Sequence, residues 1–243
     1  MPTTTNTVTE ERRQVHAIQV KATTPSPSLS STATTLRTLY NRAARAFLTR
    51  DIVQTQSLLE AAVSLLQPPN LLPDPLAGQR RKWDILRITL ETTIHSSPPP
   101  QSSDSLPESL RQVLLQTPHA LINAIYARSL AFFAVQASAV PVFLPSQVLI
   151  TLVYSSLKLE CPDVGRVMIE DWLSRRHSSH EAPDYQEGGY NKVLELYCLQ
   201  VLPKLEQWDY AFDFLEYEQE LSKESREVCQ FCRTLPTLTS YSF

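Results

Sequence analysis

Residues 190–215 read YNKVLELYCLQVLPKLEQWDYAFDFL, and the spacing of apolar side chains in this stretch indicates the fold class. A first apolar set recurs every three or four residues, which places it on one face of a helix. Its members are Tyr190, Val193, Tyr197, Val201 and Leu205. A second set follows at Trp208, Phe212 and Leu215. Pro203 lies between the two sets and has no backbone N–H to continue a helix, so we expect two amphipathic helices joined by a tight bend at this proline.

The same helical periodicity recurs along most of the chain, and no segment shows the alternating pattern of a strand. We expect roughly nine helices, with Asp51 as the N-cap of the second and Trp83 in the core of a central third helix. Their expected ranges are about 33–49, 52–66, 79–94, 107–116, 118–138, 145–159, 162–176, 190–202 and 206–221, with a weaker helix over about 222–233. Short bends join them, which predicts an all-α fold of stacked antiparallel helical hairpins, a degenerate tetratricopeptide-like α-solenoid.

Length and composition favour one helical domain with irregular ends. Residues 1–32 are rich in Thr, Ser and Pro and predict a disordered N-terminal tail, residues 33–235 form the helical domain, and residues 236–243 form an irregular C-terminal tail. The uncharged span from Ser129 to Leu157 is interrupted by Pro141 and Pro145. We therefore expect two buried helices that meet at an elbow rather than one membrane span.

The composition argues against several functional classes. With only four glycines, the chain cannot build the glycine-rich phosphate loops of nucleotide-binding folds. Residues 1–122 carry 12 Lys/Arg and 9 Asp/Glu, whereas residues 123–243 carry 10 and 16. This mild polarity fits a protein-binding surface better than a nucleic-acid footprint, which needs a basic face throughout. Four scattered cysteines and the absence of an apolar signal segment in residues 1–32 predict a reducing compartment.

Candidate catalytic and metal-binding groups are few. Cys229 and Cys232 have a spacing typical of metal or redox sites, but zinc needs two further ligands and only His177 and His180 offer a similar spacing. A thioredoxin-like site would need a strand before the motif, and the sequence predicts none. We therefore expect no catalytic residue, no metal, no cofactor and no small-molecule substrate, so the protein is not expected to be an enzyme.

The helix expected over residues 33–49 is a candidate partner surface. Its apolar stripe contains Leu36, Leu39, Tyr40, Ala43, Phe47 and Leu48. Arg37, Arg42, Arg45 and Arg50 point away from that stripe. Such arginines beside exposed apolar side chains suit a groove on a partner protein, and a solvated face is the alternative. The acidic residues between Glu206 and Glu224 have the same two interpretations, a solvated face or a docking surface for a basic partner.

Several short segments occur in an order and spacing that resemble a known family. They are Leu144–Leu149, Asp171–Leu173, Tyr190–Glu195 and Val201–Pro203, together with the N-terminal helices over Ala46–Leu66. Covering about 33–225 in patches, they resemble the peroxisomal tail-anchored receptors called peroxin twenty-six, whose yeast counterpart is peroxin fifteen.

The resemblance implies a peroxisome biogenesis factor with no catalysis of its own. In that family a cytosol-facing helical domain recruits the heteromeric AAA-ATPase that extracts the ubiquitinated import receptor, and the ATPase binds the N-terminal helices. Carried onto this chain, the implied partner-binding residues are Leu39, Arg42, Arg45, Phe47, Leu48 and Arg50. The implied location is the cytosolic face of the peroxisomal membrane.

The chain departs from the family at its C-terminus. Family members end in a transmembrane helix, whereas this sequence stops at Leu235–Phe243 without one, so by itself we expect it to be soluble and cytosolic. The main alternative function is a generic tetratricopeptide-like scaffold with an unrelated client. A metal- or thiol-dependent enzyme that uses Cys229 and Cys232 is a third hypothesis.

Overall fold

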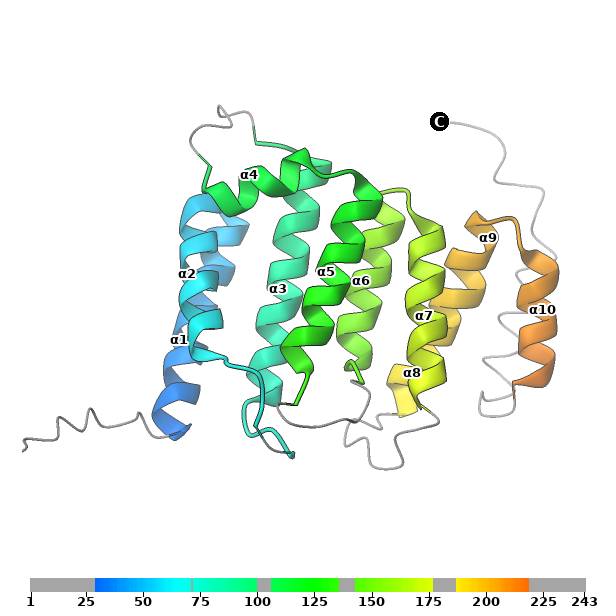
Figure 1. Ribbon diagram of the computed structural model, residues 1–243, viewed down its shortest axis with the longest axis horizontal. Coiled ribbons are helices and arrows are strands. Elements are labelled where there is room, and N and C mark those ends of the chain that lie inside the picture. The colour runs from blue at the N-terminus through cyan, green and yellow to red at the C-terminus, as the bar shows by residue number, and fades with distance from the viewer. Residues whose placement is uncertain (1–28, 71, 100–105, 136–142, 177–186, 219–243) are drawn as a thin grey trace, which may run out of the picture.

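The computed structural model describes residues 29–70, 72–99, 106–135, 143–176 and 187–218, and within these ranges the chain is all-α, with ten α-helices and no strand. The helices are α1 (Leu29–Leu48), α2 (Ile52–Leu65), α3 (Ala77–Ser96), α4 (Glu108–Leu115), α5 (Pro118–Phe133), α6 (Ser146–Lys158), α7 (Pro162–Arg176), α8 (Glu187–Leu196), α9 (Leu202–Lys204) and α10 (Trp208–Tyr217). A π-turn over Tyr197–Val201 joins α8 to α9 without a break. Figure 1 shows the helices in a row, with α1 and α2 at one end and α10 at the other.

The turn between α1 and α2 is set by two adjacent residues. Arg50 adopts a left-handed backbone conformation (φ 59°), which ends α1 and reverses the chain. The Asp51 side chain then accepts a hydrogen bond from the backbone N–H of Gln54 at 2.9 Å, which confirms Asp51 as the N-cap of α2.

The start of α1 differs from the expected position. The helix begins at Leu29, four residues before the expected residue 33. The hydroxyls of Thr34 and Thr35 donate to the carbonyls of Ser30 and Ser31 at 2.9 and 3.0 Å, so the Ser/Thr-rich sequence bonds to the helix backbone instead of competing with it.

The helix that contains Pro203 also differs from the expectation. The chain does not bend at Pro203. It stays helical to Lys204 and turns at Glu206, which has a positive φ of 58°. The π-turn immediately before Pro203, in which the N–H of Leu202 donates to the carbonyl of Tyr197, widens the helix and relieves the usual clash of the proline ring with the preceding turn. The apolar stripe is confirmed, since Val193, Tyr197 and Val201 are all buried.

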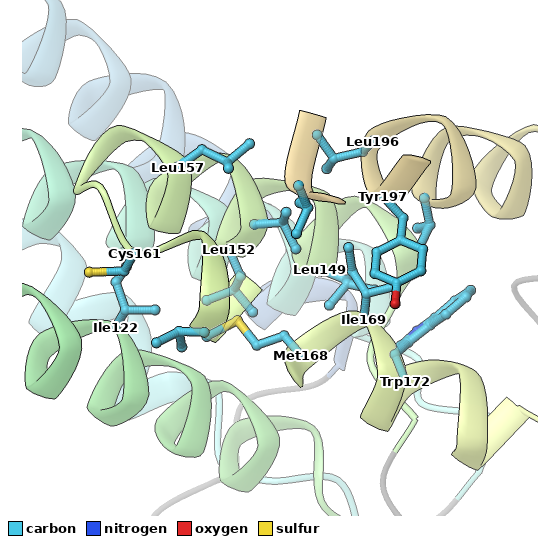
Figure 2. Packing of buried hydrophobic residues seen from close by; sticks show 14 of the residues in the cluster. Ile122, Leu149, Leu152, Leu157, Cys161, Met168, Ile169, Trp172, Leu196 and Tyr197 are labelled. Atoms are coloured by element: carbon cyan, nitrogen blue, oxygen red, sulfur yellow. The ribbon is translucent and has the colours of Figure 1, made fainter. Parts of the chain in front are cut away.

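Buried apolar side chains form two clusters that share α3. The larger one gathers side chains from α5 to α10, and Figure 2 shows Ile122, Leu152 and Met168 among its members. The smaller one packs α1, α2 and α4 onto α3 around Trp83, which has no exposed surface. The expectation that Trp83 lies in the core is therefore confirmed, and α3 is the central helix.

The long uncharged span divides between two helices, as expected. α5 ends at Phe133, earlier than the expected residue 138, and α6 starts at Ser146. The first half of the expected elbow, residues 140–142, lies outside the described residues. In its second half, Leu144 is held because the indole Nε1 of Trp172 donates to its carbonyl at 2.8 Å. No helix in the described ranges has the length and hydropathy needed to cross a bilayer.

Helices α6 and α7 pack closely together at Gly165. A methyl group at this position would overlap the hydroxyl of Ser156, which is held by a 2.7 Å hydrogen bond to the carbonyl of Val153. We expect Gly165→Ala to lower the free energy of unfolding by about 1–3 kcal/mol, measured by urea denaturation, because overpacking strains a close-packed interface.

The control for this prediction removes the obstructing hydroxyl. In a Ser156→Ala background, Gly165→Ala should become neutral or stabilising by up to about 1 kcal/mol, because alanine is the better helix former. Gly78→Ala, at a position where nothing lies within 4 Å of the added methyl group, should be stabilising in either background. An unchanged effect of Gly165→Ala after removal of the hydroxyl would show that overlap with Ser156 is not the cause.

Candidate functional site

The outer face of α1 carries positive charges that no acidic side chain of the same helix balances. Arg37, Arg42 and Arg45 are exposed on one side of the helix together with Leu48, whose side chain is 80% exposed. The twenty residues of α1 include no acidic residue, and no ion pair within the described part of the chain involves these arginines. We call Arg37, Arg42, Arg45 and Leu48 the α1 basic face.

The residues expected to bind a partner divide between two sides of α1. Arg42, Arg45 and Leu48 follow one another at intervals of three and are exposed together. Leu39 and Phe47 are half-buried and pack against the smaller core cluster. Arg50 is exposed in the turn after the helix. The structure therefore brings three of the six residues together on a solvent-facing surface, and adds Arg37 to them.

A Cys–His–Asp cluster joins the starts of α5 and α7. The Sγ of Cys161 lies 3.3 Å from Nδ1 of His119, and Nε2 of His119 lies 3.2 Å from Oδ1 of Asp163. This order of groups is the one that activates a thiol nucleophile in cysteine hydrolases. Periodicity and motif spacing could not reveal this cluster, because His119 and Cys161 are 42 residues apart.

The surroundings of Cys161 do not suit a nucleophile. The residue is only 1% exposed, and its Sγ also contacts the carbonyl of Leu159 at 3.3 Å. Burial raises the pKa of the thiol, and the negative charges of Asp163 and Glu160 raise it further. Reactive cysteines need an accessible thiolate, so we interpret the cluster as a packing contact between α5 and α7.

The second polar cluster lies between α3 and α5. Arg87 donates to Asp84 within α3, and Arg128 of α5 donates to Glu91 of α3. The guanidinium group of Arg87 also lies 5.2 Å from the centre of the Phe132 ring. Burial raises the pKa values of the Asp84 and Glu91 carboxyls, and the neighbouring arginines oppose that rise. Because these charged groups pair with one another rather than face a pocket, the cluster positions helices.

The remaining candidates from the sequence are the cysteine and histidine pairs with a metal- or redox-type spacing. Cys229, Cys232, His177 and His180 are outside the described residues, so their role stays a prediction. Among the residues that are described, no group of three His, Cys, Asp or Glu side chains is arranged to hold a metal ion.

Comparisons of the chain with protein-family models, curated proteins and solved structures find no match.

The thiol of Cys161 gives a direct test of the packing interpretation. We expect iodoacetamide at neutral pH to alkylate Cys161 in the folded protein at least about a hundredfold more slowly than in the unfolded protein, because the thiol is buried and its raised pKa disfavours the thiolate. Peptide mass spectrometry over time measures both rates. Alkylation of the folded protein that is faster than in the unfolded chain would instead indicate an activated nucleophile.

The buried carboxyl of Glu91 predicts a pH dependence of stability. A carboxyl whose pKa is raised by folding binds its proton more tightly in the folded state, so its contribution to stability falls as the pH rises above the ordinary carboxyl pKa. Glu91→Gln should therefore gain stability relative to the wild type as the pH rises, in urea denaturation at a series of pH values. Arg128→Met removes a charge that opposes the pKa rise, so it should extend the fall in stability to higher pH. A difference between Glu91→Gln and wild type that does not change with pH would contradict this account.

Proposed function

We propose that this chain is a helical adaptor that recruits the AAA-ATPase of the peroxisomal export machinery through the α1 basic face. The observation that carries the proposal is a group of three exposed arginines with no acidic partner among the described residues, beside an exposed leucine. Arginines next to an apolar anchor are favoured at the centres of protein interfaces, where they bind acidic surfaces. The identity of the client comes from the sequence resemblance.

We regard the row of helices as a degenerate tetratricopeptide-like α-solenoid, a class that presents helix faces to partner proteins. Several residues in the segments that resemble the family are buried, among them Trp172, Val201 and Leu202. The resemblance therefore concerns the packing of the row, whereas the α1 basic face supplies the docking surface.

Calorimetry tests this proposal on the full chain and the N-terminal domain of each ATPase subunit. We expect saturable binding to one subunit, weakened at least about tenfold by Arg42→Glu together with Arg45→Glu, because charge reversal replaces attraction by repulsion. Leu48→Ser should weaken it as well, since it removes an exposed apolar contact. Phe47 is not a suitable test position, because it packs against the core.

The control is Lys158→Glu, which reverses one positive charge at an exposed position at the end of α6. It should leave the affinity within about twofold of wild type, since exposed charges more than a Debye length of about 10 Å apart are largely screened. Binding that survives reversal of both arginines would reject this surface but retain the client. The absence of binding to every subunit would reject the client and leave the alternative, a helical scaffold for an unrelated protein.

A further inference from the structure

The last described helix has an outer face of opposite character to α1. Asp209, Asp213 and Glu216 follow at intervals of four and three, so they share one side of α10, and all are exposed. Tyr210 and Tyr217 flank them with 45% and 82% of their surfaces exposed. We call these five residues the α10 acidic face. On the opposite side of the helix, Ala211 and Leu215 are buried.

The charges of the α10 acidic face are not balanced locally. α10 contains no basic residue, and no ion pair within the described ranges involves Asp209, Asp213 or Glu216. Arg166 of α7 lies over the Tyr210 ring, 5.0 Å from its centre, but its guanidinium group bonds to Glu170 and Gln207. The three carboxylates therefore remain available to a positively charged partner.

The α1 basic face matches this surface in charge and length. Arg37 and Arg45 are eight residues apart, about 12 Å along a helix, and Asp209 and Glu216 are seven apart, about 10.5 Å. Tyrosine rings beside the carboxylates can accept the guanidinium groups over their faces. Figure 1 shows α1 and α10 at opposite ends of the row, so the two faces of one molecule cannot meet.

The two end segments of the chain outside the described ranges carry little net charge, and therefore match the α10 acidic face less well than α1 does. Residues 219–243 contain three basic and three acidic side chains. Residues 1–28 contain three basic and two acidic ones. α1 is different, because its three arginines occur in a helix that contains no acid.

We propose that the α10 acidic face docks on the α1 basic face of a second copy of this chain. The contact is heterologous, since two different surfaces meet, so each added molecule presents a new free end and the assembly grows head to tail. This contact between two copies uses the same α1 basic face as the proposed docking of the ATPase, but it does not depend on that docking. At any one α1, the two partners compete.

Complementary charge reversal tests the contact with the full chain. The first variant combines Arg42→Glu and Arg45→Glu, so both of its ends are acidic. The second combines Asp209→Lys, Asp213→Lys and Glu216→Lys, so both of its ends are basic. Each variant alone should stay monomeric, whereas an equimolar mixture should associate, because every acidic end then finds a basic one.

Sedimentation velocity measures the association. For wild type we expect a weight-average sedimentation coefficient that rises with protein concentration in about 50 mM salt, and an association at least about tenfold weaker in about 500 mM salt, where the Debye length shrinks to a few ångströms. Circular dichroism shows whether each variant keeps its helices. Asp213→Asn is a smaller change than the triple substitution on α10, and it should also weaken association. Lys158→Glu should associate as the wild type does.

The outcomes separate this proposal from the proposed function. A wild-type protein that stays monomeric at about 100 µM in low salt, or a mixture of the two variants that stays monomeric while both are folded, would overturn head-to-tail association. Association of either variant alone to the same extent as wild type would also overturn head-to-tail association. The second variant keeps α1 intact, so it should lose self-association and keep any affinity for the ATPase domains.

Discussion

The arrangement of the helices depends on the pairing of charged side chains buried along α3. Asp84, Arg87 and Glu91 are each less than 10% exposed, and removing charges from water is costly unless each one finds a partner. Arg87 pairs with Asp84 inside the helix, but Glu91 requires Arg128 of α5. The ion pair between Glu91 and Arg128 therefore fixes how α5 lies on α3, in a way that apolar packing alone would leave adjustable.

The same helix supports the surface that we propose for docking. Trp83 of α3 meets the ring of Tyr40 of α1 edge to face, with centroids 5.4 Å apart, so the inner side of α1 is held against the core. The arginines of α1 then project from a fixed helix rather than from a loop. At the other end of the row, Tyr197 packs edge to face against Phe214 and holds α10 in the same manner. Both charged faces are thus displayed by anchored terminal helices.

Local features were predictable and pairings between distant residues were not. Asp51 caps α2 by bonding to Gln54, three residues away, and the buried stripe through Val193, Tyr197 and Val201 follows directly from its spacing. The prediction of a bend at Pro203 was wrong. The wider π-turn before it relieves the clash of a proline inside a helix, and only a packed tertiary structure stabilises such a turn. The contact of His119 with Cys161 depends on how α5 meets α7, and the sequence carried no sign of it.

For the candidate surfaces, the sequence by itself determined the helical character of the chain and the arginines that alternate with apolar residues in α1, because helix periodicity relates side chains only three or four positions apart. The tertiary structure decided that Leu39 and Phe47 face the core while Leu48 faces solvent, because the side of a helix that is buried depends on its neighbours. It also placed the basic α1 and the acidic α10 at opposite ends of the row, since only packing sets the distance between segments that are far apart in the chain.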